Sequence, residues 1–431
     1  MRWGFGVPIE LYRSDTLLVR QVAIEGCDRW VITFDHHSIG DGFDREGFGE
    51  SFLKANGISA IHVLGRGNDW YQYDDIFAAA AVVRAATSGA VRRVAYGSSM
   101  GAYAAVRLAD AIGADAVLAL SPQWSIDPSI ANWDTRWSQD AHRIRWLSTM
   151  AGPLRCPAST VLVYDPHLTL DRRHAQLIAE QTGSHLLPVA HCLHPASTFL
   201  GEVGLLRGLL EDVLYDRFDG SAMAREIRAR RASSSVYLGA LAERQPAVRP
   251  RTAIALARKA RLVKPDSALG MLSLAQILTR TGNHDEALAI HRHIAVKVNR
   301  LPIYLVPFAN ALVSAGEGRE ALAVAGEVVD AEPDVGHLRN WYATMLWRRG
   351  ERAAAVAQIA RAVALNPAER RYRRKFLRYR LARHAWRVFE VVTFQAIRKR
   401  ASDRRRNAAL DASAIAGRRG VRADVGDVEG V

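Results

Sequence analysis

Gly97-Ser98-Ser99-Met100-Gly101 is the stretch that decides the fold of the first half of this 431-residue chain. It follows a short apolar run, Val91 to Tyr96, and precedes an alanine-rich helical stretch that begins at Ala102. This order predicts a strand, a sharp turn with a strained serine, and a helix, and the glycines let strand and helix approach closely. Such a turn raises the Ser99 hydroxyl to the top of a sheet, where a histidine can deprotonate it. The pentapeptide also occurs in turns without chemistry, so its flanks and the downstream residues carry the prediction.

Short apolar runs alternate with helical patterns up to about residue 215. Strands alternating with helices predict an α/β fold with a parallel sheet, in which functional residues gather at the carboxyl ends of the strands. The expected strands are 29–34, 58–64, 91–96, 116–120, 160–164 and 185–189, and the expected helices are 75–87, 102–111 and 171–181. We therefore predict one α/β domain over residues 1–215.

The second half of the chain is wholly helical in pattern and repeats. Glycines recur every 34 residues at Gly282, Gly316 and Gly350, and alanines recur with the same spacing at 253, 287, 321 and 355. A helix-turn-helix pattern with this period resembles the tetratricopeptide repeat. We expect at least three repeats over residues 240–370, joined to the first domain by a polar, arginine-rich linker at 216–239.

A serine nucleophile needs a base, and the base needs an acid that orients it. Asp165 directly follows the expected strand 160–164, so it ends a strand at the same edge as Ser99. Two histidines, His191 and His194, lie in the loop after the last strand. His194 is preferred because Pro195 and an apolar helix follow it, and His191 stays as the alternative.

Backbone N–H groups are needed to stabilise the oxyanion that forms when a serine attacks an ester. Met100, directly after Ser99, is one expected donor, and the second is expected at the end of an early strand, at Phe34 or Asp35. His36 and His37 follow, but no carboxylate–histidine spacing typical of a metal site accompanies them. We predict no metal and no cofactor.

These residues together resemble the α/β-hydrolase superfamily, in which the triad runs serine, acid, histidine along the chain. The resemblance covers residues 1–215 and implies a three-layer fold and an esterase, thioesterase, peptidase or acyltransferase that acts through an acyl-serine. It assigns the catalytic roles to Ser99, Asp165 and His194. Residues 121–156 leave room only for a small cap, and no His-Gly oxyanion motif is present.

The charge of the chain is concentrated in one segment. The formal net charge is +14, and residues 370–406 hold 15 Lys or Arg against two acidic residues. We predict a basic capping or amphipathic helix at 371–400, with an anionic membrane surface as a possible partner, and a disordered tail at 401–431. The three cysteines, 27, 156 and 192, and the lack of an apolar leader predict a cytoplasmic protein.

Three functions remain open from the sequence. The first is a serine esterase or thioesterase whose repeats recruit a partner protein. The second is an acyl- or acetyltransferase, or a deacetylase, that acts on a glycan, because Trp124, Trp133 and Trp137 in the cap could stack on a sugar. The third is a scaffold whose hydrolase domain is inactive. The acyl group, the acceptor, the partner protein and the oligomeric state are not determined by the sequence, and no specific nucleic acid is expected.

Overall fold

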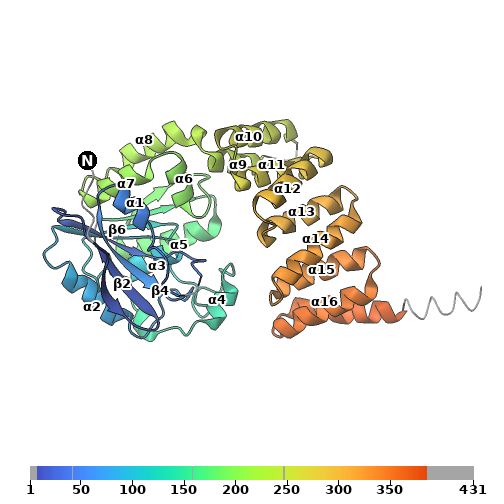
Figure 1. The fold of residues 1–431 in the computed structure, drawn as a ribbon, viewed down its shortest axis with the longest axis horizontal. Coiled ribbons are helices and arrows are strands. Elements are labelled where there is room, and N and C mark those ends of the chain that lie inside the picture. Colours follow the sequence, from blue (N-terminus) through green and yellow to red (C-terminus); the bar gives the residue numbers. More distant parts are fainter. Residues whose placement is uncertain (1–6, 41, 158, 246–247, 386–431) are drawn as a thin grey trace, which may run out of the picture. The chain divides into compact units, whose positions relative to one another are not determined.

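The computed structural model describes residues 7–40, 42–157, 159–245 and 248–385. These residues form two compact units that divide after Asn283. In the part of the chain that the structure describes, the first unit contains a mixed sheet with flanking helices and the second contains helices and no strand (Figure 1). The predicted α/β region followed by a helical region is therefore confirmed.

Within the described residues, the sheet of the first unit has eight strands in the order β1-β2-β4-β3-β5-β6-β7-β8. β2 runs antiparallel to both of its neighbours, β1 and β4, and the other pairs of neighbouring strands described are parallel. The sequence pattern did not predict β1 and β2, which form a hairpin at the edge. The strands are β1 (Ile9–Arg13), β2 (Leu17–Val22), β3 (Arg29–Phe34), β4 (Ser59–Gly65), β5 (Arg92–Ser98), β6 (Ala116–Leu120), β7 (Ser159–Tyr164) and β8 (His185–Pro188).

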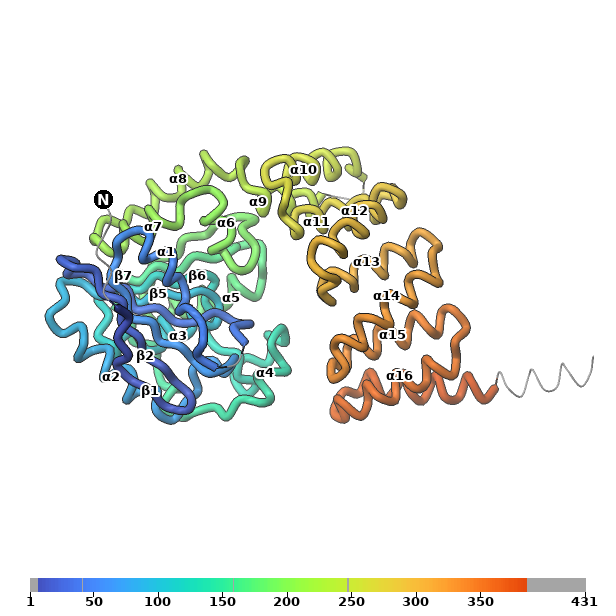
Figure 2. The backbone as a smooth tube through the Cα atoms, viewed as in Figure 1, coloured from blue at the N-terminus to red at the C-terminus, as the bar shows by residue number. Residues whose placement is uncertain are grey.

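Helices cover both faces of this sheet, so the first unit has three layers (Figure 2). Because side chains alternate along a strand, Ile32 of β3 points to one layer and Val31 to the other. One layer contains α2 (Ile76–Ala86), α3 (Met100–Arg107) and α5 (Thr169–Thr182), and the other contains α1 (Glu50–Ala55), α6 (Ala196–Glu202) and α7 (Leu206–Leu214). The central strands are buried on both faces, which explains their continuous apolar sequences.

The segment predicted as a linker, 216–239, is not a linker. It contains α8 (Gly220–Arg230) and the first residues of α9 (Ser235–Glu243). Met223 and Ile227 of α8 are buried in the core on the α7 side of the sheet, and α9 packs against α6. The polar and arginine-rich composition of this segment reflects the exposed faces of these helices.

Helix pairs repeat along the rest of the chain at the predicted period. The first helices of successive pairs, α11 (Ala268–Arg280), α13 (Pro302–Ser314) and α15 (Gly336–Arg348), begin 34 residues apart. The second helices, α10 (Pro250–Val263), α12 (His284–Lys297), α14 (Gly318–Ala331) and α16 (Arg352–Leu365), do the same. The compact first unit includes α9 to α11, so the structural division at Asn283 falls inside the predicted repeat region 240–370.

The recurring glycines end the first helix of each pair. Gly282, Gly316 and Gly350 have φ of 82°, 87° and 86°, which glycine adopts without the strain a side chain adds. In each case the next residue donates its backbone N–H to the helix five residues earlier, as Glu317 does to Leu312 at 2.9 Å. The recurring alanines 253, 287, 321 and 355 are instead buried between packed helices.

A further helix at residues 370–385 packs onto the last pair. Tyr379 is buried and stacks on Trp347 with ring centroids 4.0 Å apart. This helix covers the apolar face of α15 and α16, as the predicted capping helix would. Residues 386–400 of that predicted helix and the predicted tail 401–431 lie outside the described residues. In the described part of the chain, no helix has the length and the apolar composition needed to span a membrane.

Candidate active site

The turn between β5 and α3 holds Ser99 in a strained backbone conformation. Its φ is 55° and its ψ is −115°, which a side chain rarely adopts. Both flanking glycines are required by space: a Cβ on Gly97 would lie 2.3 Å from the backbone of Gly101, and one on Gly101 would lie 2.2 Å from the carbonyl oxygen of Phe34. The turn thus presents Ser99 at the carboxyl end of the sheet.

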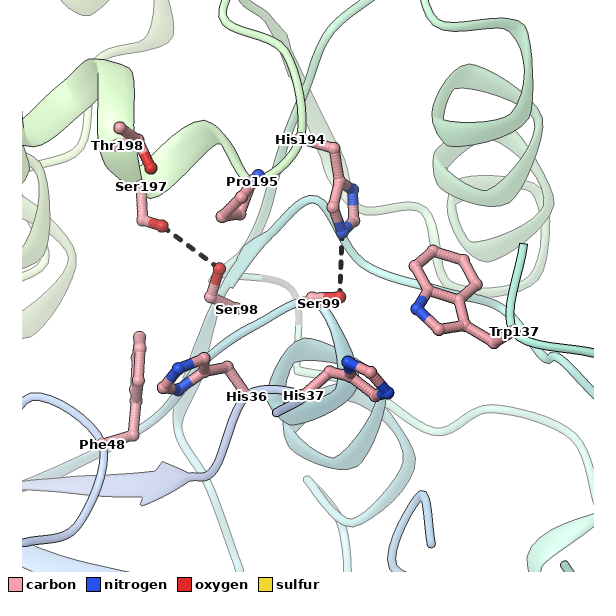
Figure 3. A pocket seen from close by; sticks show the side chains of 10 residues that line it. All are labelled: His36, His37, Phe48, Ser98, Ser99, Trp137, His194, Pro195, Ser197 and Thr198. Atoms are coloured by element: carbon pink, nitrogen blue, oxygen red, sulfur yellow. Dashed lines mark hydrogen bonds between the residues drawn. The ribbon is translucent and has the colours of Figure 1, made fainter. Parts of the chain in front are cut away.

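His194 faces this serine. Its Nε2 lies 2.9 Å from Oγ of Ser99, and Figure 3 shows the ring directly above the hydroxyl. His191, the alternative from the sequence, does not reach the serine: its ring stacks on His167 with centroids 4.4 Å apart and contacts Tyr237 edge-on. The structure therefore brings His194, and not His191, to Ser99.

The acid beside His194 is Asp171. The prediction that Asp165 contacts this histidine is therefore wrong. Asp171 Oδ2 accepts a hydrogen bond from Nδ1 of His194 at 2.8 Å. Asp165 is buried, but its carboxylate accepts the backbone N–H groups of His167 at 2.9 Å and Leu193 at 3.0 Å. Asp165 therefore holds the loop that carries His194, and it makes no hydrogen bond to the imidazole.

The position of Asp171 explains why the sequence pattern missed it. It lies in the first turn of α5, six residues after Asp165, and an acidic residue there is an ordinary sign of a helix start. The strand-end position favoured Asp165, because strand ends meet at the sheet edge. Only the path of the loop between β7 and α5 shows that the helix, and not the strand, delivers the carboxylate.

Asp171 is kept ionised by its neighbours. Burial by itself raises the pKa of a carboxyl, but the hydrogen bond from His194 and the charge of Arg136 outweigh it and lower the pKa of Asp171 below its usual value. Arg136 Nη1 donates to Asp171 Oδ1 at 2.6 Å. With Asp171 ionised, Nδ1 of His194 carries the proton and Nε2 is free to accept from Ser99.

A pocket of about 390 Å³ opens over Ser99 (Figure 3). Hydroxyls line one side of it, and the Ser98 and Ser197 oxygens lie 3.3 Å apart. Trp137 lies on the opposite side of the serine from these hydroxyls, as the figure shows. The lining residues are His36, His37, Phe48, Ser98, Ser99, Trp137, His194, Pro195, Ser197 and Thr198.

The loop after β3 lies beside Ser99, but Phe34 is not positioned as an oxyanion donor. Phe34 is the last residue of β3, pairs with both neighbouring strands and does not line the pocket. The Asp35 N–H donates to the hydroxyl of Tyr71 at 2.6 Å, so it is also engaged. The loop reaches the pocket at His36 and His37. Met100 is the first residue of α3, and the first N–H groups of a helix have no partner within the helix.

Of the three cap tryptophans, only Trp137 lines the pocket. Trp133 stacks against His174 with ring centroids 4.5 Å apart, and Trp124 packs partly buried against the core. The predicted sugar-stacking cluster is therefore reduced to one indole ring, whose centroid lies 5.6 Å from that of His194.

Adjacent histidines at the pocket are held by separate partners. His37 Nε2 lies 3.1 Å from Asp140, and the His36 ring contacts Phe48. Among the described residues, no cluster of three or more His, Cys, Asp or Glu has the arrangement of a metal site. The three cysteines form no disulfide.

No family model matches this chain, and no curated protein matches it. Solved structures similar to part of it include the thermophilic TPR protein TTC0263 of Thermus thermophilus, at 19% identity over 42% of this chain and 99% of that chain, with a TM-score of 0.32. PilF of Pseudomonas aeruginosa is similar at 14% identity over 43% of this chain and 90% of that one, with a TM-score of 0.31. YrrB, described as a TPR protein with an unusual peptide-binding site, covers 40% of this chain at 15% identity, with a TM-score of 0.29.

Proposed function

We propose that this protein is a serine hydrolase of the α/β-hydrolase type that cleaves ester or thioester bonds through an acyl-serine. The observation that supports it most is the continuous contact from Ser99 through His194 to Asp171, with donor–acceptor distances of 2.9 and 2.8 Å. In this reading Asp171 replaces Asp165 as the acid. Three further features agree with the family: the strained serine turn, the strand–turn–helix around it, and the order serine, acid, histidine along the chain.

The chemistry follows from the positions of the three side chains. Nε2 of His194 removes the proton from Oγ of Ser99 as the oxygen attacks the acyl carbon, and ionised Asp171 stabilises the imidazolium that forms. His194 then gives the proton to the departing alkoxide or thiolate, which leaves an acyl-serine. Water, activated by the same histidine, attacks the acyl carbon and releases the acid and free Ser99.

The oxyanion needs N–H donors, and we assign them to Met100 and His36. Met100 begins α3 directly after the nucleophile, and its N–H lies at the positive end of that helix. His36 replaces Phe34 in this role, because it is the first residue after the engaged Asp35 N–H and it lines the pocket. Each donor is expected to contribute on the order of 10²-fold or more to kcat.

A fluorophosphonate probe tests the nucleophile directly, because it forms a covalent adduct only with an activated serine. We expect the wild-type protein to be labelled and Ser99→Ala to be unlabelled. Ser98→Ala is the matched control, since Ser98 is adjacent and also lines the pocket. Labelling that persists in Ser99→Ala, or no labelling of the wild type, would overturn the proposal and favour the inactive-scaffold alternative.

Single replacements of the two loop histidines test the base. His194→Ala should lower kcat for p-nitrophenyl butyrate by about 10⁴-fold or more, whereas His191→Ala should leave it within a few-fold. The opposite ranking would mean that the loop adopts another arrangement during turnover.

A glycan ester is the second candidate substrate, with either hydrolysis or transfer to a sugar hydroxyl. Trp137 supports it, because this ring lies across Ser99 from the hydroxyls of Ser98, Ser197 and Thr198. Turnover of an acetylated oligosaccharide and of p-nitrophenyl acetate, each measured with the wild type and with Trp137→Ala, distinguishes a glycan ester from a simple ester as the substrate. A sugar substrate should lose its advantage in the variant, whereas a simple ester should be cleaved nearly equally well.

We further propose that the helix pairs are tetratricopeptide repeats that bind a partner protein. The 34-residue spacing of their helices and glycines supports this assignment. Binding of a partner through the repeats should survive Ser99→Ala unchanged. If the full chain captures no protein in a pull-down, the proposal that the repeats bind a partner is wrong.

A further inference from the structure

Arg136 connects the cap segment, residues 121–156, to the acid of the triad. Its Nη1 donates to Asp171 at 2.6 Å, and its Nη2 and Nε donate to Asp134 at 2.8 and 3.1 Å. Both carboxylates are buried, and the Arg136 side chain is 29% exposed. One guanidinium therefore bridges a cap carboxylate and the carboxylate that contacts His194.

The anchor behind Arg136 is itself fixed to the body of the domain. Asp134 Oδ2 accepts from Nε2 of His174 at 2.9 Å, and Nδ1 of His174 accepts the backbone N–H of Trp124 at 3.0 Å. His174 belongs to α5, the helix that also carries Asp171, and its side chain is fully buried. The cap segment is thus bound to His174 of α5 at two of its own residues besides Arg136, which limits the positions available to the guanidinium.

The next residue of the cap, Trp137, contacts the base of the triad. The Arg136 guanidinium lies 4.3 Å from the centre of the Trp137 ring, and that ring lies 5.6 Å from the His194 ring. Arg136 therefore contacts the acid, while Trp137 contacts the base and lines the pocket. The two consecutive cap residues enclose the Asp171–His194 pair.

We propose that Arg136 is a positioning residue that fixes the orientation of Asp171 and so couples docking of the cap segment to assembly of the triad. The proposal rests on the proposed hydrolase function. A carboxylate can rotate and turn its oxygens away from an imidazole. The charged Arg136, bound to Oδ1 of Asp171, keeps Oδ2 of the same carboxylate directed at His194. Arg136 does not touch the reacting atoms, and it acts only through Asp171.

The test compares Arg136→Met with Arg136→Lys and with Arg145→Met. Methionine keeps much of the length of the side chain and removes the charge, whereas lysine keeps the charge but cannot bridge two carboxylates through a fork of donors. Arg145 is the matched control: it lies in the same segment, pairs with Asp74, and is 70% exposed.

With p-nitrophenyl butyrate, Arg136→Met should lower kcat by about 10- to 100-fold and change KM much less. Arg136→Lys should recover part of this loss, and Arg145→Met should match the wild type.

A second readout needs no turnover. The proton shared by Nδ1 of His194 and Asp171 should give a low-field ¹H NMR resonance, which Arg136→Met should shift or abolish and Arg145→Met should keep. The proposal is wrong if Arg136→Met keeps both the kcat and the low-field resonance of the wild type. A wild type without Ser99-dependent turnover would overturn the hydrolase function, while the resonance would still decide the role of Arg136.

If Arg136→Met does not fold, Asp134→Asn gives a second variant for the same question. It weakens the other anchor of Arg136 and leaves the contact to Asp171 in place. We expect kcat to fall about tenfold, with circular dichroism unchanged. An unchanged kcat in Asp134→Asn would contradict the proposal.

Discussion

The sheet unit and the helical repeats differ in how sequence order relates to spatial order. In the second unit, each helix from α12 to α16 packs against the next along the chain, and the glycine turns at Gly316 and Gly350 lie 34 residues apart. In the sheet unit, Ser99 and His194 are 95 residues apart in sequence and meet at the carboxyl edge of the sheet. A local period therefore describes a repeat well, whereas a site built from several loops depends on how each loop turns.

The largest expected effect tests the long-range side of this comparison, at the two carboxylates after β7. Asp171→Asn should lower kcat for an ester by about 10⁴-fold, because the amide favours the wrong tautomer of His194. Asp165→Asn should cost far less activity, since within the described structure that carboxylate accepts backbone N–H groups and not the imidazole. Steady-state kinetics on both variants checks this, and equal losses would mean that Asp165 also acts on the imidazole.

The next effect concerns the close approach of β3 and α3. Gly101→Ala should destabilise the first unit by about 3 kcal/mol or more, because the added Cβ would lie 2.2 Å from a backbone oxygen. Gly89→Ala is the control, since nothing lies within 4 Å of its Cβ. Urea denaturation and fluorophosphonate labelling measure both. If Gly101→Ala is as stable and as reactive as Gly89→Ala, then the site does not require this close approach of β3 and α3.

A buried histidine should make the repeats sensitive to acid. Burial lowers the pKa of His291 to about 4, and both ring nitrogens lack a hydrogen-bond partner within the described structure. The pKa of this histidine in the unfolded chain is about 6.5. The free energy of unfolding is therefore highest above that pH, and up to about 3 kcal/mol of it is lost as the pH falls towards 4.

Thermal melts between pH 7.5 and 4.5 measure this loss of stability. His291→Met should reduce the dependence on pH, whereas His293→Met, an exposed position on the same helix, should not change it. Parallel pH curves for the wild type and His291→Met would contradict the assignment.

The smallest expected effect concerns the glycine turns of the repeats. Gly316→Ala should cost about 1 kcal/mol, because its φ of 87° disfavours any side chain. Gly326→Ala, within α14, should instead be neutral or gain up to about 1 kcal/mol, because alanine favours the helix and the Cβ meets only an ordinary contact at 3.5 Å. Opposite signs in chemical denaturation are the expected result. Equal signs would show that the turn glycines are not required by their backbone angles.

Several features of the site could be predicted from the chain alone. The serine turn and the choice of His194 agree with the geometry. The acid and the second oxyanion donor do not, because Asp165 and Phe34 were chosen as strand-end residues. A strand end fixes an edge of the sheet, but it does not fix which residue of the following loop or helix turns towards the serine.

Sequence by itself determined the elements that depend on neighbouring residues. These are the apolar strands, the glycine-flanked serine, and the helix pairs in which a glycine ends the first helix at a constant period. Only the tertiary structure decided that Asp171 contacts His194, that Arg136 bridges it to Asp134, and that residues 216–239 are helical and packed. The physical reason is that backbone propensity acts over a few residues, whereas a hydrogen bond between distant side chains requires the whole sheet and its loops to be in place.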